Sequence, residues 1–321
     1  MENKDINTVL DKLSAVVTQC QMLQQVYLEP ARQQEAISKL SPIHSVDKLR
    51  HLELPLPDFL RAAGIRSMTV TDIDSIETVL GEVTAIAKTI AQSPGALMKH
   101  PELAKPLQQL FRHATTVAFA DWALFASASE CWDSILTQVI KPIGRRDHEF
   151  IFYLGDISGS PFFLVDELLD IMGEFSRYGK VTFILDQQEM LRLWQGLNGV
   201  HRTSGDSWPF DYEEKYRALF NAMNIQRLLV YANNGVSYYS KEQKFNLTRR
   251  VLSAAIENNG HARNDFINGY SMGLTLGVDI DIVIALGIVY YSARGEYNAA
   301  PDQQMLLNYI KTWRNLQDSV A

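Results

Sequence analysis

Apolar residues recur at three- and four-residue spacing through the first part of the chain, and this spacing is typical of amphipathic helices. Residues 3–28 carry one apolar stripe, and Pro30 marks where that helix should end. The same spacing returns over residues 72–91 and 102–139, without the alternation that a strand would show. We therefore expect residues 1–140 to form an N-terminal helical region.

The pattern changes over residues 146–240, where short apolar runs alternate with helical stretches. Residues 149–155 and 180–186 are apolar runs of strand length, and residues 161–176 between them have helical spacing. A strand–helix–strand unit of this kind predicts two parallel strands joined by a right-handed crossover. The pattern then predicts two further helices and a third strand, over residues 188–197, 212–224 and 225–231.

Helical spacing returns in the last part of the chain. Residues 280–291 would suit a buried strand or a buried helix, and their length favours a helix. Further helices are predicted over residues 245–259, 266–272 and 305–316. The predicted fold is an α/β core of a few, largely parallel strands, flanked by N-terminal and C-terminal helical regions and helix-rich overall. The predicted domains are a helical region at 1–140, the α/β core at 146–240 and a C-terminal helical region at 241–321.

The composition narrows the class of protein without identifying it. Hydrophobic residues make up 46% and charged residues 21% of the 321 residues, which are ordinary values for a globular protein. The formal net charge of -7 argues against broad nucleic-acid binding, which needs a concentrated basic surface. No apolar run reaches the roughly 18 residues of a membrane span, and the polar N-terminus lacks a signal-peptide core. We therefore expect a cytoplasmic protein with no nucleic-acid partner and no membrane span.

One segment stands out as a candidate site. Asp156-Ile-Ser-Gly-Ser160 follows the first predicted core strand, at the place where open α/β sheets bind ligands. It resembles the Asp-x-Ser-x-Ser element of the von Willebrand A (integrin I-like) fold, which coordinates Mg²⁺. The resemblance implies a metal site made of Asp156, Ser158, Ser160 and Thr203. Where that family has an Asp after the next core strand, this chain has Asn233 or Asn234. Without a metal, the segment would serve as a turn and a helix N-cap.

The long loop within the core is a second candidate. Residues 198–211 and the helix before them carry aromatic and imidazole side chains, which suit a protein-binding surface. The residues expected at this partner-binding surface are Trp194, His201, Trp208 and Phe210. In the alternative, these rings simply pack into the core. The chain lacks the common zinc, phosphate-loop, dinucleotide-binding and nucleophile-elbow motifs, so no residue is assigned as catalytic.

Residues 150–310 resemble a known family. The segments that carry the likeness are Gly235-Val-Ser-Tyr-Tyr239, Phe245-Asn-Leu-Thr248, Gly273-Leu274, Asp279 or Asp281, Gly295, Tyr297, Pro301 and Leu306. Together they resemble the end of the type VI secretion adaptor (chaperone) family, whose members load effectors onto the spike tip. The resemblance implies a non-enzymatic adaptor or chaperone of bacterial secretion, with a protein partner and no cofactor.

Three functions remain open, and the first is preferred because catalytic motifs are absent. The first is the protein-binding adaptor, which would use the 198–211 loop and the C-terminal helices. The second is a Mg²⁺-binding interaction domain of the von Willebrand A type, with its site at Asp156, Ser158 and Ser160. The third is a small-molecule enzyme in the strand-end cleft around Asp156, Asp186 and the same loop, which predicts a deep pocket with a strongly shifted carboxylate. Whether the protein is an enzyme is left open, with a preference for a non-enzymatic role.

Overall fold

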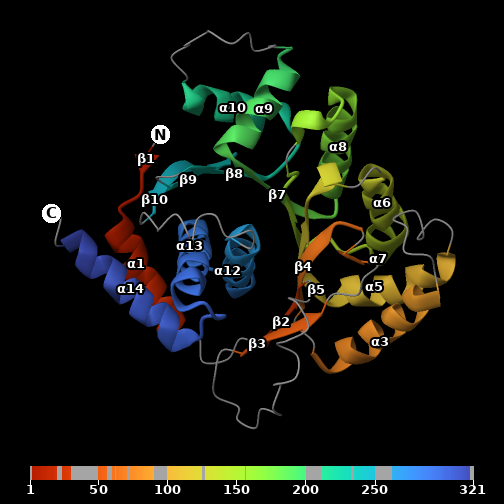
Figure 1. The fold of residues 1–321 in the computed structure, drawn as a ribbon, viewed down its shortest axis with the longest axis horizontal. Coiled ribbons are helices and arrows are strands. Elements are labelled where there is room, and N and C mark those ends of the chain that lie inside the picture. The colour runs from red at the N-terminus through yellow and green to blue at the C-terminus, as the bar shows by residue number, and fades with distance from the viewer. Residues whose placement is uncertain are drawn as a thin grey trace.

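The computed structural model describes residues 2–19, 24–29, 50–55, 60–61, 63–70, 73–89, 100–124, 127–155, 157–199, 211–232, 235–249 and 262–318. It shows a ten-stranded mixed sheet (Figure 1). The central strands run parallel and are β5 (Ala114–Phe119), β6 (His148–Phe152), β7 (Gly179–Asp186) and β8 (Arg227–Ala232). Beyond β8, the sheet continues through antiparallel β9 (Gly235–Ser240) to β10 (Lys244–Thr248) and β1 (Glu2–Asn3). Beyond β5, it continues through antiparallel β4 (Ile65–Val70) to β2 (Gln24–Glu29) and β3 (Arg50–Pro55).

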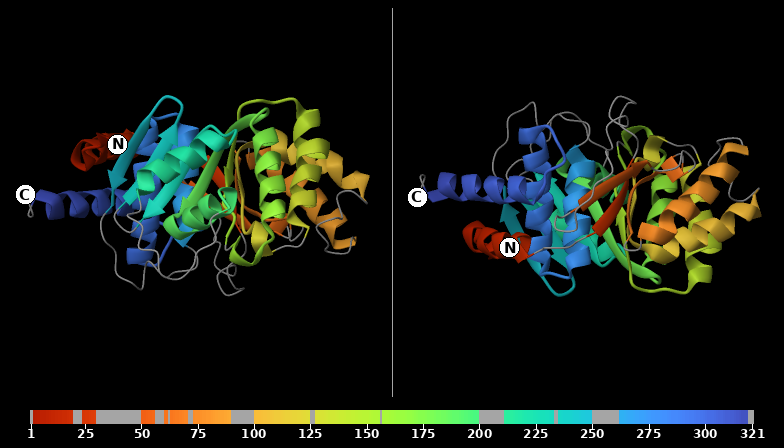
Figure 2. Two further views of the ribbon diagram at one scale, coloured as in Figure 1. Left: turned by 90° about the horizontal axis from the view of Figure 1, so that it is seen from above. Right: turned by 90° about the horizontal axis from the view of Figure 1, so that it is seen from below.

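Helices cover both faces of the sheet and make a three-layer α/β/α arrangement (Figures 1 and 2). The first face carries α3 (Ile73–Thr89), α5 (Ala104–His113), α6 (Ala128–Ile135), α8 (Phe162–Phe175), α9 (Gln187–Leu197) and α10 (Tyr212–Ala222). The second face carries α1 (Ile6–Gln19), α12 (Ala262–Leu276), α13 (Ile280–Tyr297) and α14 (Gln303–Asp318). Short helical segments lie between these elements: η2 (Pro101–Leu103), η3 (Trp122–Leu124), η4 (Leu136–Ile140), α7 (Lys141–Ile143) and η5 (Ile157–Gly159).

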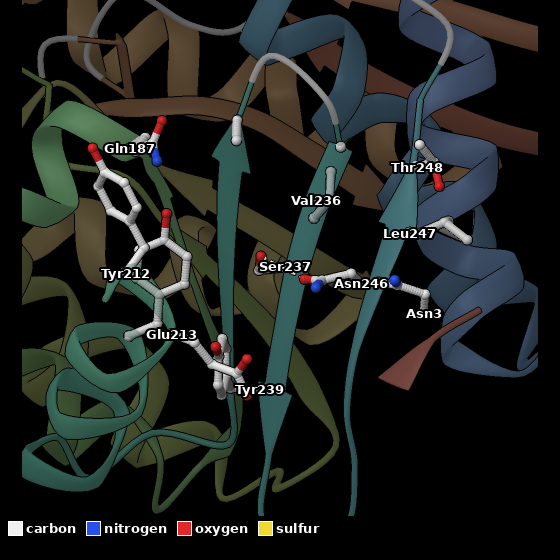
Figure 3. A pocket seen from close by; sticks show the side chains of 13 residues that line it. Asn3, Gln187, Tyr212, Glu213, Val236, Ser237, Tyr239, Asn246, Leu247 and Thr248 are labelled. Atoms are coloured by element: carbon white, nitrogen blue, oxygen red, sulfur yellow. Dashed lines mark hydrogen bonds between the residues drawn. The ribbon is translucent and has the colours of Figure 1, made fainter. Parts of the chain in front are cut away.

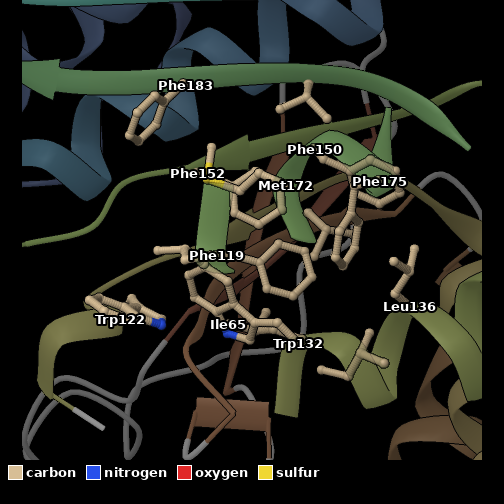
Figure 4. Packing of buried hydrophobic residues seen from close by; sticks show 14 of the residues in the cluster. Ile65, Phe119, Trp122, Trp132, Leu136, Phe150, Phe152, Met172, Phe175 and Phe183 are labelled. Carbon is tan, nitrogen blue, oxygen red and sulfur yellow. The ribbon is translucent and has the colours of Figure 1, made fainter. Parts of the chain in front are cut away.

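An aromatic cluster holds the first helical layer against the central strands (Figure 4). Phe119 of β5 stacks on Phe152 of β6, with ring centroids 4.9 Å apart. Phe175 of α8 meets both rings edge-on, at interplanar angles of 65° and 74° and with centroids 5.2 Å from each. Trp132 of α6 packs on Phe119 at 5.3 Å and donates its indole N–H to the Ala63 carbonyl at 2.8 Å. Such ring pairs each add about 0.5–1.5 kcal/mol beyond the area they bury, so the ends of β5 and β6 are firmly fixed.

The second helical layer is built on close contact between α12 and α13. Residues 281–294 of α13 are buried on every side, so this helix has no polar face. The backbones can approach because Gly273 of α12 lies against α13: a Cβ there would come 2.8 Å from the Cα of Val283. A buried ion pair between Asp265 and Arg294, 3.0 Å apart, joins the two helices.

Although α13 is long and apolar, no described helix meets the length and hydropathy needed to cross a membrane.

The α/β prediction for the centre of the chain is confirmed. β6, α8 and β7 form a unit whose strands pair in parallel, with Phe150 opposite Val181. The choice of a helix over residues 280–291 is also correct, because α13 covers that segment. The prediction of a small core flanked by helical regions is only partly right, because the sheet has ten strands and the core was predicted to have only a few.

The prediction that residues 1–140 form only helices is wrong, because this segment contributes β1, β2, β3, β4 and β5. Residues 114–119 were merged into one long helix because the run Ala-Thr-Thr-Val-Ala-Phe is buried almost throughout, which hides the alternation of a strand. The helix predicted over 245–259 is also wrong at its start, where β10 pairs with β9; residues 250–261 lie outside the described residues. The division into three domains stays a prediction, and one sheet takes strands from all three segments.

Candidate functional site at the carboxyl edge of the sheet

The parallel strands all end at the same edge of the sheet, which we call the carboxyl edge. The polar residues at these ends are Asp121 after β5, Tyr153 after β6, Asp186 of β7 and Tyr231 of β8. Antiparallel β4 starts at this edge, because Ile65 pairs with Phe119, and it thereby brings Arg66 beside the end of β5. The carboxyl edge therefore gathers charged and hydroxyl groups from segments that are far apart in the sequence.

The charges are densest where β7 passes into α9. Asp186 is the N-cap of α9: its Oδ1 accepts the Glu189 backbone N–H at 2.7 Å, and Glu189 Oε2 accepts the Asp186 N–H at 2.9 Å. This reciprocal capping box determines how both carboxylates are oriented. Arg263 of α12 then donates to Glu189 Oε1 at 2.9 Å and to Asp186 Oδ2 at 3.3 Å. One guanidinium therefore joins the second helical layer to the start of α9.

Burial shifts the acidity of one carboxyl group in this cluster, that of Glu189. The Glu189 side chain is only 8% exposed, and burial raises its pKa above the ordinary value, against the opposing effect of Arg263. The Asp186 side chain is 44% exposed and remains open to solvent. The two carboxylates are adjacent but differ in environment, a difference that enzymes use to give neighbouring acids separate roles.

Tyr153 lies at the centre of the carboxyl edge. Its ring lies 5.1 Å from the guanidinium carbon of Arg263, and its hydroxyl donates to Asn264 Oδ1 at 2.7 Å. Burial raises the pKa of Tyr153, with a further contribution from the negative charge of Asp121. The phenol therefore stays protonated, and it serves as a fixed donor between the β5 and β7 ends of the edge.

At the β5 end, Asp121 receives a hydrogen bond from Arg66 Nε at 2.9 Å. The Asp121 backbone has φ 53°, in the left-handed region that residues other than glycine rarely adopt. The facing loop after β6 contains Gly155, with φ 76°. Non-glycine residues held in this conformation are found disproportionately at functional sites. The apolar spacing over residues 102–139 placed Asp121 within a predicted helix, whereas it lies just after strand β5 and is ion-paired with Arg66.

A cavity of about 410 Å³ opens at the ends of β7 and β8, and we call it the strand-end cavity. Its lining residues are Asp186, Gln187, Gln188, Tyr231, Ala232 and Arg249. The Tyr231 ring packs edge-on against Phe266, with centroids 4.7 Å apart. Its hydroxyl oxygen is buried and makes no hydrogen bond to the described part of the protein. Burial raises the pKa of Tyr231, so the phenol stays protonated.

The predicted metal site is only partly visible. Asp156, Thr203 and the side chain of Ser158 lie outside the described residues. Ser160 is half-buried, and its backbone N–H donates to the Ile157 carbonyl at 3.0 Å, as expected of a turn. Within the described ranges, no three His, Cys, Asp or Glu side chains group closely enough to hold a metal ion. The metal site therefore stays a prediction.

The predicted partner-binding surface is visible only at Trp194. His201, Trp208 and Phe210 lie outside the described residues. Trp194 is half-buried in α9, packs against the core of the first face, and has Lys215 Nζ 4.9 Å from its ring centroid. This packing agrees with the alternative in which the ring belongs to the core. The partner-binding surface stays a prediction.

Sequence reasoning named Asp186 but missed the groups around it. The pair Asp186 and Glu189, three residues apart before an apolar helix, is the capping-box signature and could have been recognised. Tyr153 lay inside a predicted strand, and its contact with Arg263 depends on how α12 packs. Local spacing carries no signal for that contact, because the two residues are more than a hundred positions apart.

Comparison with known proteins returns small-molecule kinases among the solved structures, whereas no family model and no curated protein matches the chain. Ribokinase of Arabidopsis thaliana, complexed with ribose and ATP, is 16% identical with a TM-score of 0.44, over 64% of this chain and 58% of that one. A nucleoside kinase of Methanocaldococcus jannaschii is 16% identical with a TM-score of 0.43, over 65% and 61%. Adenosine kinase of Sinorhizobium meliloti is 16% identical with a TM-score of 0.39, over 57% and 50%.

This chain thus spans about half to three fifths of the length of these kinases. The TM-scores are below 0.5 and the identities below 25%, so the similarity assigns no function to this chain. It does correct the resemblances stated above, because the matched proteins are kinases and not secretion adaptors or von Willebrand A domains. The adaptor or chaperone function in bacterial secretion is therefore wrong. The expectation of no cofactor is corrected as well, since the Arabidopsis structure holds ATP.

Proposed function

We propose that the protein is a small-molecule enzyme whose ligand binds in the strand-end cavity through a negatively charged group. The observation that supports this most directly is that Asp186, Arg249 and Tyr231, whose buried hydroxyl has no partner among the described residues, line one cavity of about 410 Å³. That volume lies within the range of pockets that enclose small ligands. The cavity also lies at the carboxyl ends of parallel strands, where α/β proteins commonly bind their ligands.

The preference for a negative group follows from two features of the lining. Arg249 contributes a permanent positive charge. Gln187 and Gln188 are the first residues of α9, whose backbone N–H groups have no acceptor within the helix. A helix N-terminus favours anions through these donors and through the helix dipole, worth about 0.3–1 kcal/mol at an exposed site. The Tyr231 hydroxyl adds one further donor.

An enzymatic role is supported by the carboxylates beside the cavity. The small-molecule hypothesis predicted a pocket with a shifted carboxylate, and Glu189, whose pKa is raised by burial, lies one helical turn from the lining residue Asp186. Perturbed acids in clefts are candidates for proton transfer. In this proposal Asp186, the more exposed carboxylate, accepts a proton from the ligand, and Arg263 positions it.

The first test is ligand binding to the full chain, measured by calorimetry and thermal shift. The first probes are ATP with and without Mg²⁺, ribose and inorganic phosphate, chosen because the Arabidopsis structure holds ribose and ATP. We expect an anionic probe to bind, Arg249→Gln to weaken it about tenfold, and Tyr231→Phe to weaken it about threefold to tenfold. Arg177→Gln is the matched control, because Arg177 is 68% exposed and outside the cavity lining.

Turnover is the second test. Asp186→Asn should remove most of the turnover of a substrate while changing its affinity by less than about threefold, since the amide keeps the N-cap acceptor. Equal binding by wild type, Arg249→Gln and Tyr231→Phe would contradict the placement of the site. Full turnover by Asp186→Asn would contradict the role of that carboxylate.

A further inference from the structure

A second cavity, of about 400 Å³, lies where the β8–β9–β10 part of the sheet meets α10, and we call it the hairpin cavity (Figure 3). It shares Gln187 and Ala232 with the strand-end cavity, but its other walls come from different elements. The lining side chains that matter here are Tyr212, Glu213, Tyr216, Tyr239 and Asn246. The proposed function makes no use of them.

Aromatic rings form one wall of the hairpin cavity. The Tyr216 and Tyr239 rings meet at 89° with centroids 6.1 Å apart, and the Tyr212 ring lies 6.2 Å from that of Tyr216. The three rings therefore form a continuous group, with Glu213 beside it on α10 (Figure 3). Rings of this kind attract a cation through their negative faces, by about 0.5–2 kcal/mol according to how far it is desolvated.

Tyr239 brings a polar group to this wall that the described residues leave unused. The residue is 2% exposed, and its hydroxyl oxygen has no hydrogen-bond partner among the described residues. Leaving a buried hydroxyl unpaired costs about 1–3 kcal/mol, which a ligand that hydrogen-bonds to it would recover. Burial also raises the pKa of this phenol, so it remains neutral and can accept a hydrogen bond.

The described lining of the hairpin cavity carries negative charge only. No Lys or Arg side chain is among its described lining residues, whereas Glu213 is. Asp211 also acts on Tyr239, and Arg217 opposes it from outside the lining. Asn246 accepts a hydrogen bond from Ser237 Oγ at 2.7 Å through its amide oxygen. A phosphate or carboxylate would thus meet a carboxylate and three aromatic rings, and no Lys or Arg of the described lining would hold it.

We propose that the hairpin cavity binds a small organic cation that carries a primary ammonium group. The ammonium lies against the rings of Tyr212 and Tyr216, donates one hydrogen bond to the Tyr239 hydroxyl oxygen, and is neutralised by Glu213. This site is distinct from the strand-end cavity in its charge preference. Binding of a cation here can therefore be tested independently of the proposed function, which concerns an anionic ligand in the strand-end cavity.

The test uses the full chain and calorimetric titration with four probes: ethanolamine, tetramethylammonium, glycerol and inorganic phosphate. Ethanolamine should bind. Tetramethylammonium should bind more weakly, because it cannot donate a hydrogen bond to Tyr239. Glycerol and phosphate should not displace either cation. Glu213→Gln should weaken both cations about tenfold. Tyr239→Phe should weaken ethanolamine about threefold to tenfold and leave tetramethylammonium unchanged.

These variants are expected to fold. Tyr239→Phe removes a hydroxyl that has no partner among the described residues, and Glu213 is exposed. Glu242→Gln is the matched control, because it removes one exposed carboxylate at the tip of the same hairpin, outside the lining. No saturable ethanolamine binding, binding of glycerol or phosphate in place of the cations, or equal losses in Glu242→Gln and Glu213→Gln would each overturn the proposal.

Discussion

The guanidinium of Arg263 lies over the ring of Tyr153, with its central carbon 5.1 Å from the ring centroid, while its nitrogens bond to Glu189 and Asp186. This one side chain joins α12 on the second face to the ends of β6 and β7 and to the first turn of α9. The geometry of the carboxyl edge therefore depends on the position of α12. Because α12 is held tightly against α13, the packing of the second helical layer determines where the Arg263 guanidinium meets the Asp186 carboxylate.

Replacing Arg263 with Met should destabilise the protein by about 2 kcal/mol, because Glu189 would be left buried without its cation. The cost should be larger at pH 8 than at pH 5. The pKa of Glu189 is already raised by burial, and without Arg263 it would rise further, so a lower pH neutralises the stranded carboxylate. Urea unfolding of wild type and variant at both pH values measures the difference.

Two comparisons identify the cause of that loss. Adding Glu189→Gln to Arg263→Met should recover much of the stability, since no buried charge then remains. Arg177→Met removes an exposed pair with Glu174 and should cost less than about 0.5 kcal/mol. If the double variant were less stable than Arg263→Met alone, the loss would come from packing and not from the unpaired charge.

Two Gly→Ala substitutions should have opposite effects on stability, because Gly273 lies at the contact between α12 and α13 whereas Gly81 lies on an open helix surface. Gly273→Ala should cost about 1–3 kcal/mol, because the new Cβ would come 2.8 Å from the Val283 Cα, a backbone atom that cannot easily move. Gly81→Ala in α3 should stabilise the protein by about 0.5–1 kcal/mol, because its Cβ meets nothing within 4 Å and alanine is the better helix former. Thermal unfolding of both variants measures this, and a stable Gly273→Ala would show that the helices are not so close.

The parts of the fold that the sequence predicted are those where local pattern and burial agree. The strand–helix–strand unit from β6 to β7 shows clear changes of period, and the length of α13 distinguishes it from a strand. β5 was missed because its six residues continue the apolar stripe of the flanking helices and are buried almost throughout. Local spacing cannot separate such a strand from a helical turn.

The candidate site was less predictable than the fold. Asp186 could be named because it follows an apolar run. The predicted α12 segment began only at residue 266, so Arg263 lay outside it, and the role of Tyr153 depends on contacts with Asn264 and Arg263. Such contacts are set by how separate layers pack. The aromatic loop that suggested a partner surface lies mainly outside the described residues.

The burial of His148 should make the folded protein less stable at mildly acidic pH. His148 is fully buried at the start of β6. Burial, assisted by the charge of Arg145, lowers its pKa from 6.5 to about 4. Between these values the unfolded chain binds a proton that the folded protein excludes, so stability falls as the pH falls from 6.5 towards 4. The shift corresponds to a loss on the order of 3 kcal/mol across that window.

The His148 effect is measured by urea unfolding between pH 7.5 and 4.5. His148→Phe should flatten the dependence on pH in this range, because the ring at this position beside Phe150 can no longer take up a proton. The variant should also retain most of its stability at pH 7.5, where the wild-type imidazole is neutral. A variant with the same slope as the wild type would assign the acid sensitivity to other groups.

Asp121 combines an ion pair with a left-handed backbone, and substitutions can separate the two. Asp121→Asn loses the charge that faces Arg66 but keeps a side chain that tolerates φ near 53°, so it should cost about 1 kcal/mol. Asp121→Ala loses the charge and also strains the backbone by about 1 kcal/mol more. Asp121→Gly loses the pair but removes the strain, and should fall close to Asp121→Asn. Urea unfolding at pH 7 should therefore rank the stabilities as wild type, then Asn and Gly, then Ala. An alanine variant as stable as the asparagine variant would mean that the left-handed backbone carries no strain, and the stability of Asp121 would then rest on its hydrogen bond with Arg66 alone.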